Sequence, residues 1–316
     1  MFDKAEPWLV EDNGGPIKLY SDGSVVRAPN PFESLFLTEH NNYGHVPYKD
    51  IVFDEETGLW ARLYLSPETK NRLPIVMYFH GGGFCMLSAA STLYHRMCQM
   101  WAAKLGVIIV SVDYRLAPEH RLPAAYDDSI AALRWMEREG AAKDPWLVSQ
   151  ADFSKIFLAG DSAGGNIAHH VGVWAASKTV EMKIKIKGLI LLYPFFGGED
   201  RTPSETEKGS SMLTAEGLDS MWRLALPVGC HRDHPYSNPL AEGETLCSLD
   251  LPPVLCAIGG RDILRDKELE YCEALKKWGK RIEVHNFAEE DHGFTVMKME
   301  GQSSLQVLGR IADFIK

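Results

Sequence analysis

Short apolar runs alternate with segments of helical period over most of this chain. From residue 75 onward, continuous apolar runs are separated by stretches in which apolar residues recur every three or four positions. The runs predict buried strands at 75–79, 107–112, 156–159, 186–193, 254–258 and 282–287. The stretches between them predict helices at 94–104, 124–138, directly after 162, 266–278 and 305–315. Strands that alternate with helices are typical of an α/β protein with a mostly parallel sheet flanked by helices.

The residues before position 75 follow another pattern, which predicts antiparallel strands. Residues 17–20 and 25–27 are separated by Asp22-Gly23, a turn signal of β-hairpins. Two further strands are predicted at 48–53 and 59–65, the second because every other residue is apolar. The stretch 28–46 before them has no clean period. We expect it to form a flap that folds over a pocket.

The alternation breaks between residues 194 and 239. A polar run is followed by an amphipathic segment, 215–226, before the next predicted strand. We interpret 194–239 as a cap inserted between two strands of the sheet. Met221, Trp222 and Leu226 are candidate residues for the wall of a substrate pocket, and a small core of the cap itself would need the same residues.

Composition and charge favour a single globular catalytic domain over 1–316. The apolar content of 45% allows a sizeable core, and the net charge of -10 argues against nucleic acid as a partner, because phosphate binding requires clustered Lys and Arg. No secretory signal is visible, and no apolar stretch reaches the roughly 18 residues of a membrane span. We therefore expect no membrane partner and a cytoplasmic location.

Six cysteines are scattered through the chain without C-x-x-C spacing. We expect them to be reduced thiols that act as small apolar residues, rather than metal ligands or half-cystines. They are Cys85, Cys98, Cys230, Cys247, Cys256 and Cys272.

A strand-to-helix turn around Ser162 carries the strongest chemical signal. The segment Gly160-Asp161-Ser162-Ala163-Gly164 matches G-x-S-x-G, follows an apolar strand and precedes a helix-forming run. Glycines leave room for a backbone that crosses close behind the serine. The motif alone also arises by chance as a loop of small residues. In its strand-to-helix context it indicates a nucleophile elbow, with Ser162 as the nucleophile.

A glycine run follows the first strand of the α/β part. His80-Gly81-Gly82-Gly83-Phe84 has the H-G-G-G form of an oxyanion-hole loop, in which unhindered backbone N–H groups face a developing oxyanion. A flexible glycine turn is the alternative. The pairing of this loop with an elbow further along the chain favours acyl-transfer chemistry.

A serine nucleophile needs a base, and the base needs a carboxylate that orients it. In this topology the acid precedes the histidine, and each follows a sheet strand. Asp262 directly follows the predicted strand 254–258, and His292 follows 282–287. We therefore predict Asp262 as the orienting acid and His292 as the base.

Other residues near these positions have simpler interpretations. Asp266 competes with Asp262, but we place it at the N-cap of the next helix, where Asp is common. The run 289–291 is acidic and has the composition of a solvated loop. His169 and His170 fall inside the helix after the elbow, where a histidine is committed to packing or to the surface.

These motifs resemble one family, the plant carboxylesterases of the hormone-sensitive-lipase group in the α/β-hydrolase superfamily. The resemblance rests on 80–84, 113–125, 160–166, Asp262 and His292, and it extends over nearly the whole chain. Details at 195–202 and 232–234 look most like members that include strigolactone-cleaving esterases.

The resemblance implies an α/β-hydrolase fold in which the N-terminal segment 1–50 forms part of a lid over the pocket. It also implies an oxyanion hole formed by the N–H groups of Gly82, Gly83 and Ala163. Phe84, which follows the glycine run, is a further candidate for substrate binding. The gibberellin receptors of this family lack the histidine that is present here as His292. The dehydratase and alkaloid-cyclase relatives look different around the two glycine motifs.

We therefore expect a serine carboxylesterase that acts on small-molecule esters or lactones, as a monomer or weak dimer, with no metal or cofactor. Two alternatives stay open: a small-molecule receptor on a hydrolase fold, and a dehydratase or cyclase that uses the same site for elimination.

Overall fold

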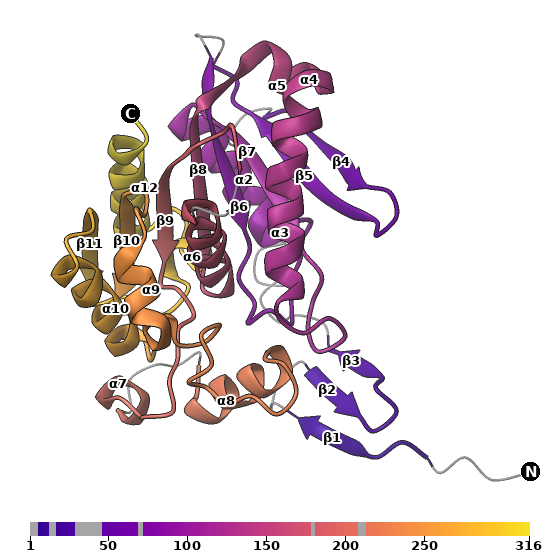
Figure 1. Ribbon diagram of the computed structural model, residues 1–316, viewed down its shortest axis with the longest axis vertical. Coiled ribbons are helices and arrows are strands. Elements are labelled where there is room, and N and C mark those ends of the chain that lie inside the picture. Colours follow the sequence, from indigo (N-terminus) through magenta and orange to yellow (C-terminus); the bar gives the residue numbers. More distant parts are fainter. Residues whose placement is uncertain (1–5, 13–16, 29–45, 69–71, 178–180, 208–212) are drawn as a thin grey trace, which may run out of the picture.

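An eight-stranded sheet forms the centre of the computed structural model (Figure 1). The structure describes residues 6–12, 17–28, 46–68, 72–177, 181–207 and 213–316. The strand order is β11-β10-β9-β8-β6-β7-β5-β4. Strands β6 to β11 run parallel, whereas β5 pairs antiparallel with both β4 and β7. The predicted mostly parallel sheet is confirmed.

The strands agree closely with the apolar runs of the sequence. Their bounds are β4 Tyr48–Asp54, β5 Leu59–Leu65, β6 Leu73–Phe79, β7 Ile108–Asp113, β8 Ala151–Asp161, β9 Ile186–Leu192, β10 Val254–Gly259 and β11 Ile282–Phe287. The longest of them, β8, begins five residues before its predicted start, because the less apolar stretch 151–155 also belongs to the strand. It leads directly into the elbow.

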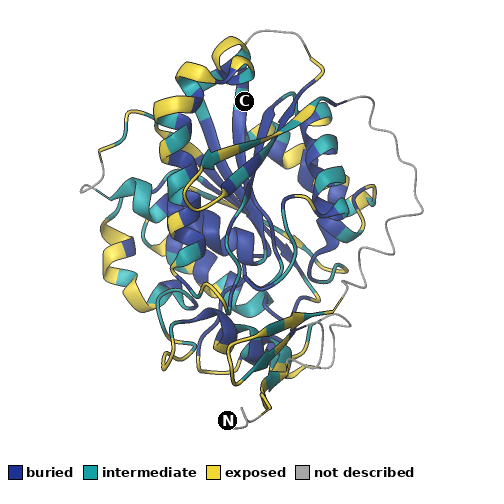
Figure 2. Cartoon of the chain, turned by 90° about the vertical axis from the view of Figure 1, so that its right-hand side faces the viewer, coloured by how far each residue is buried: buried dark blue, intermediate teal, exposed yellow. Residues whose placement is uncertain are grey.

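Helices cover both faces of the sheet, and the sheet lies buried between them (Figure 2). Buried side chains of α3, α6 and α10 pack on one face, and those of α2 and α12 pack on the other. The long helices are α2 Thr92–Leu105, α3 Ala124–Trp135, α6 Ala163–Ala176, α8 Ala215–Ala225, α10 Arg265–Lys277 and α12 Gln302–Phe314. The short ones are α4 Ala141–Lys143, α5 Pro145–Gln150, α7 Pro203–Thr206, α9 Gly243–Ser248 and α11 Phe294–Met297, with a π-helical turn at Met136–Gly140 and a 3-10 turn at Pro239–Glu242.

A second, three-stranded sheet lies at the N-terminus. The predicted hairpin is confirmed as β2 (Ile17–Tyr20) and β3 (Val25–Arg27), and β1 (Leu9–Asp12) adds a strand that was not predicted. Figure 1 shows this sheet beside α8, to which Glu11 is bonded. The predicted flap, 28–46, falls almost entirely outside the described residues.

The segment 194–239 lies between β9 and β10, as expected of an insertion. Its helix α8 begins after Thr214, whose side chain accepts a hydrogen bond from the Gly217 N–H. One expectation nearby is wrong: α10 begins at Arg265, so Asp266 lies inside the first turn and is not the N-cap. Its carboxylate instead accepts from the backbone N–H of Ser204.

Candidate active site

Ser162 occupies a strained position between β8 and α6. Its φ of 52° lies in the left-handed region that side chains rarely adopt, and its N–H donates to the Leu192 carbonyl. Two glycines make this turn possible. A Cβ on Gly164 would lie 1.8 Å from the Phe79 oxygen, and one on Gly160 would lie 2.2 Å from the Gly164 oxygen. The turn therefore has the geometry of a nucleophile elbow.

The structure brings Ser162, His292 and Asp262 together. The His292 Nε2 lies 2.9 Å from the Ser162 Oγ, and the Nδ1 lies 2.7 Å from an Asp262 carboxylate oxygen. A carboxylate only accepts hydrogen bonds, so Nδ1 carries the proton and the neutral ring leaves Nε2 free to accept from Ser162. Asp262 is 1% exposed and His292 6%, so the histidine–carboxylate pair is shielded from water.

Adjacent strands place the acid and the histidine. β10 and β11 are neighbours, and the loops that follow them are in close contact at Gly260 and Ala288. A Cβ on Gly260 would lie only 2.4 Å from the Ala288 Cα. The second oxygen of Asp262 accepts from the Leu264 N–H, which fixes the carboxylate. The ring of Tyr193 packs edge-on against His292 at 5.0 Å between centroids.

The predicted oxyanion loop lies beside the elbow. β6 and β8 are paired with Phe79 opposite Gly160, so the residues after each strand end at the same edge of the sheet. Gly82 and Gly83 have φ values of 111° and 59° and line the same cavity as Ser162. A Cβ on Gly82 would lie 2.3 Å from the Met86 oxygen. Ala163, the third candidate, is the first residue of α6 and is buried.

A cavity of about 200 Å³ opens next to Ser162 and His292. Most of its walls are apolar. Its lining residues are Gly82, Gly83, Met86, Leu87, Leu93, Tyr94, Asp161, Ser162, Phe195, Leu213, Leu218, Met221, His292, Gly293, Val296 and Met297. A site that joins a serine–histidine pair to an apolar cavity suits acyl transfer on an apolar substrate.

A family model described as the alpha/beta hydrolase fold matches residues 76–296. The chain belongs to the α/β-hydrolase family. The hydrolase is 38% identical to probable carboxylesterase 6 of Arabidopsis thaliana, over 97% of this chain and 91% of that protein. An esterase from Pyrobaculum calidifontis superposes with a TM-score of 0.73 at 31% identity, over 85% of this chain and 84% of the other.

Relatives with other names also match the hydrolase. A 2-hydroxyisoflavanone dehydratase of Glycyrrhiza echinata is 35% identical over 95% of this chain and 94% of that protein. A gibberellin receptor of Arabidopsis thaliana is 36% identical over 84% of this chain and 79% of that protein. The predicted family, the plant carboxylesterases of the hormone-sensitive-lipase group, is confirmed, and the carboxylesterase relatives and esterase structures identify a serine carboxylesterase.

Asp161, which the sequence did not single out, connects the elbow of the hydrolase to its glycine loop. One carboxylate oxygen accepts from the Tyr78 hydroxyl and the Gly81 N–H, and the other accepts from the Tyr94 hydroxyl. Burial raises the pKa of Asp161. The only sequence signal was its place beside Ser162, since tyrosines on a buried strand and a helix read as core.

Three of the four substrate-binding candidates are not among the residues that line the cavity. Met221 lines the cavity, whereas Phe84, Trp222 and Leu226 are buried in the core and are not among the lining residues of the described chain. The Trp222 ring stacks on Phe195 at 4.3 Å, and Phe195 in turn faces the cavity. Trp222 therefore supports the wall without forming it. On an amphipathic helix, sequence alone does not separate these two roles.

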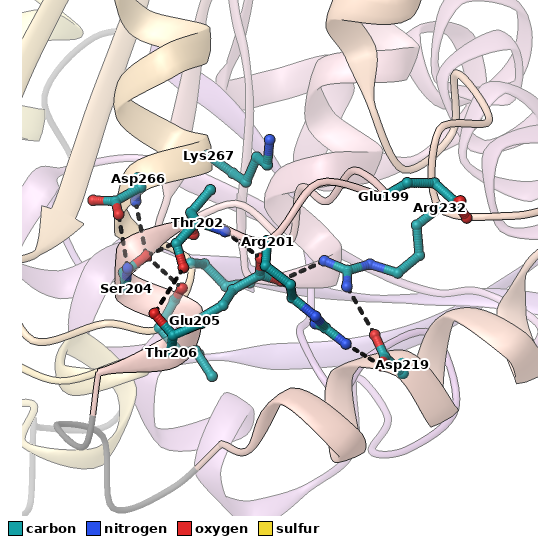
Figure 3. A network of polar contacts seen from close by, with 12 residues as sticks. Glu199, Arg201, Thr202, Ser204, Glu205, Thr206, Asp219, Arg232, Asp266 and Lys267 are labelled. Atoms are coloured by element: carbon teal, nitrogen blue, oxygen red, sulfur yellow. Dashed lines mark hydrogen bonds and ion pairs between the residues drawn. The ribbon is translucent and has the colours of Figure 1, made fainter.

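An ionic network fixes the helix that carries Met221 (Figure 3). Asp219 of α8 accepts from Arg201 and, at 2.8 Å, from Arg232. Both arginines also bond the buried carboxylate of Glu205 in α7. On another side of α8, Glu11 accepts from Ser220 and Arg223. These contacts hold one wall of the cavity against the rest of the hydrolase.

The other histidines and acids that the sequence offered as catalytic alternatives have partners outside the site. His169 pairs with the Tyr271 hydroxyl at 2.9 Å, and burial lowers the pKa of His169 far below its usual value. In the acidic loop, Glu289 pairs with Arg261 and Glu290 with Lys298. All six cysteines are free thiols, as predicted, but Cys230 and Cys247 are exposed and so do not act as buried apolar residues. None of the helices in the described ranges has the length and apolarity needed to cross a membrane.

Proposed function

We propose that this carboxylesterase hydrolyses small-molecule esters through an acyl intermediate on Ser162. The observation that carries the proposal is the position of His292, which lies in hydrogen-bond contact with Ser162 and Asp262 at the edge of the apolar cavity. The predicted triad and oxyanion residues are the groups to which we assign the reaction.

In the proposed mechanism, His292 Nε2 removes the proton from Ser162 as the Oγ attacks the ester carbonyl. The N–H groups of Gly82, Gly83 and Ala163 stabilise the oxyanion, and the imidazolium then protonates the leaving alcohol. Water activated by His292 releases the acid. Asp262 holds the ring in the required tautomer and stabilises its charged form, which its short contact with Nδ1 supports.

We infer that the substrates are neutral at the group that enters the cavity. Leucine, methionine, valine and phenylalanine side chains supply most of the wall, and Asp161, the one acidic side chain among the described lining residues, is engaged by two tyrosines and a backbone N–H. A charged acyl group would lose its hydration without gaining a partner. The more specific assignment of the substrates as strigolactone-like lactones stays a prediction.

The test is labelling and turnover with the intact protein. A fluorophosphonate probe is expected to label Ser162, and p-nitrophenyl acetate is expected to turn over. Ser162→Ala should remove labelling and lower kcat by at least about 10⁴-fold while the thermal unfolding curve is kept. Folded wild-type protein that is neither labelled nor active would overturn the proposal.

Elimination is the second candidate, and the 2-hydroxyisoflavanone dehydratase relatives are the observation that favours it. In such a reaction the same residues would transfer protons without an acyl intermediate. A burst of p-nitrophenol, or an acyl group trapped on Ser162, favours hydrolysis. The receptor alternative is less well supported, because His292 lies in contact with Ser162 as a base requires.

We also propose that 1–50 and 194–239 act as lid and cap of one catalytic domain. The bonds from Glu11 to Ser220 and Arg223 support this arrangement, since they tie the N-terminal sheet to a helix of the insertion. The cytoplasmic location and the monomer or weak dimer stay predictions. Two relatives in tulip are named as chloroplastic enzymes.

A further inference from the structure

Glu268 is a fully buried acid that the proposed mechanism does not use. It lies in the first turn of α10, is 0% exposed, and has no hydrogen-bond partner for either carboxyl oxygen among the described residues. A buried carboxylate without a partner is costly, whereas a neutral carboxyl group is far less so. This environment favours the protonated, neutral form of Glu268.

The acid lies next to the proposed triad. One oxygen of Glu268, one of Asp262 and one ring nitrogen of His292 all lie within 4.8 Å of one another. Two carboxylates this close inside a protein cannot both be charged without a large penalty, so one of them keeps its proton. Asp262 accepts hydrogen bonds from the Leu264 N–H and the His292 ring, donors that stabilise a carboxylate, whereas neither oxygen of Glu268 has a donor among the described residues.

The groups around Glu268 also favour its protonated form. Burial, then the Asp262 charge, then Cys272 one turn along α10 raise the pKa of Glu268 well above its usual value. Cys256 of β10 and Tyr193 after β9 also interact with it. Both stay neutral, because a hydrogen bond with Cys272 and burial raise the pKa of Cys256, and burial raises the pKa of Tyr193. In the proposed reaction, a positive charge arises beside Glu268 on the imidazolium of His292.

We propose that Glu268 is a positioning residue that keeps its proton beside Asp262, so that the two carboxyl groups face His292 with a single negative charge. The O–H of the neutral acid is oriented by the Asp262 charge and draws part of that charge away from the imidazole. His292 then stays a free base at lower pH than it would beside an unassisted carboxylate. The proposal rests on the proposed function of His292.

Two variants of similar volume test it, with kcat/KM for p-nitrophenyl acetate measured against pH. Glu268→Gln keeps a neutral group with a donor, and the acidic limb of its profile should stay within about 0.3 units of wild type. Glu268→Met keeps the volume but removes the donor. Its acidic limb should move up by about one unit, a tenfold loss of activity at low pH.

Infrared spectroscopy gives a readout that does not depend on turnover. Wild-type protein at neutral pH should show the carbonyl stretch of a buried, protonated carboxylic acid, and Glu268→Gln should lack that band. The proposal is overturned if the band is absent from wild type, if Glu268→Gln moves the acidic limb down by a unit, or if both variants match wild type. If Glu268→Met fails to fold, the Glu268→Gln profile and the band decide.

An inactive wild-type protein that shows the band would refute the hydrolase mechanism and leave the protonated Glu268 standing. An active wild-type protein without the band would refute the role of Glu268 alone.

Discussion

At the scale of single residues, the backbone around Ser162 tolerates few side chains. Gly160 and Gly164 leave the space in which the elbow passes behind β6, and Ser162 itself takes a positive φ. The same residues carry the proposed chemistry. Packing and reactivity are therefore difficult to change separately at this turn.

Gly164→Ala is expected to prevent correct folding. Its Cβ would lie 1.8 Å from the backbone oxygen of Phe79, an atom that cannot move without breaking the β6–β8 pairing. We expect little soluble protein or a fall in Tm of at least about 10 °C, since large losses of stability follow such backbone clashes. Gly309→Ala is the matched control: nothing lies within 4 Å of its Cβ, so α12 should gain up to about 1 kcal/mol. Equal thermal curves for the two variants would contradict this account.

Asp262→Asn is expected to leave the fold intact and lower kcat by about 10⁴-fold, because an amide no longer fixes the tautomer of His292. Stopped-flow or steady-state turnover of p-nitrophenyl acetate measures the effect. Asp266→Asn, in the nearby helix, should change kcat less than threefold, as its carboxylate binds the Ser204 N–H. Similar losses in both variants would refute the choice of Asp262.

The chemistry-bearing residues were predictable because their signals are local. Ser162 lies in a motif, and Asp262 and His292 follow apolar runs that read clearly as strands. Asp161 and Glu268 gave no such signal. Their importance arises from tyrosines, a backbone N–H and a carboxylate that other parts of the chain supply.

At the scale of elements, α8 presents three different faces. Leu218 and Met221 line the cavity, Asp219 faces the arginines of the ionic network, and Ser220 and Arg223 bind Glu11. The position of this helix therefore depends on polar contacts, while its effect on the substrate is exerted through apolar side chains.

Asp219→Asn should loosen α8 and raise KM more than it lowers kcat. Loss of the charge weakens both arginine contacts, and we expect KM for an apolar ester to rise about three- to tenfold with kcat within twofold. Glu216→Gln, an exposed change on the same helix, is the control and should leave both constants as they are. A kcat effect without a KM effect would argue against this role of the network.

The ion pair between Glu11 of β1 and Arg223 of α8 is expected to make a contribution to stability that depends on pH. The Arg223 guanidinium lowers the pKa of Glu11, so the folded state favours the charged form, and the resulting stability is lost as the pH falls through the folded pKa. Arg223 is half exposed, which limits the contribution to about 1 kcal/mol at neutral pH. Glu11→Gln should therefore lower Tm by about 1–3 °C at pH 7 and by almost nothing below pH 3. A difference in Tm that is constant across this range would contradict the prediction.

Elements with a strong period were found from the sequence, and so were the short hairpin strands β2 and β3, which the Asp22-Gly23 turn marks, but other short elements were not. All eight strands of the main sheet correspond to predicted strands. The helices α7, α9 and α11 and strand β1 are four to six residues long, too short for a helical or alternating pattern to stand out. The error at Asp266 has the same origin, since helix starts are decided by contacts such as that with Ser204.

At the scale of the whole molecule, the proposed reacting groups lie along one edge of the sheet. Loops after β6, β8, β10 and β11 supply the glycines, the serine, the acid and the histidine. This is the edge at which open α/β sheets bind their ligands. The arrangement was predictable from chain order, whereas the shape of the cavity was not, because its wall combines side chains from segments far apart in the sequence.

The volume of the cavity predicts a preference among acyl groups. Each methylene that is buried contributes about 0.8 kcal/mol, or about fourfold in kcat/KM. With about 200 Å³ available, kcat/KM for p-nitrophenyl esters should rise from acetate to butanoate or hexanoate and then level off or fall. A series in which acetate is the best substrate would contradict an apolar acyl site in this cavity.

The hydrogen bonds of Asp161 have a consequence for how this enzyme can diverge from its relatives. They join the elbow after β8 to the glycine loop after β6, so the two loops form one rigid block on adjacent strands. The side chains of α8 that face the cavity belong to an inserted segment outside that block. Substitutions in the insertion can therefore alter which substrates bind while the position of Ser162 stays the same. New specificities can arise by single mutations that leave the elbow and the glycine loop unchanged.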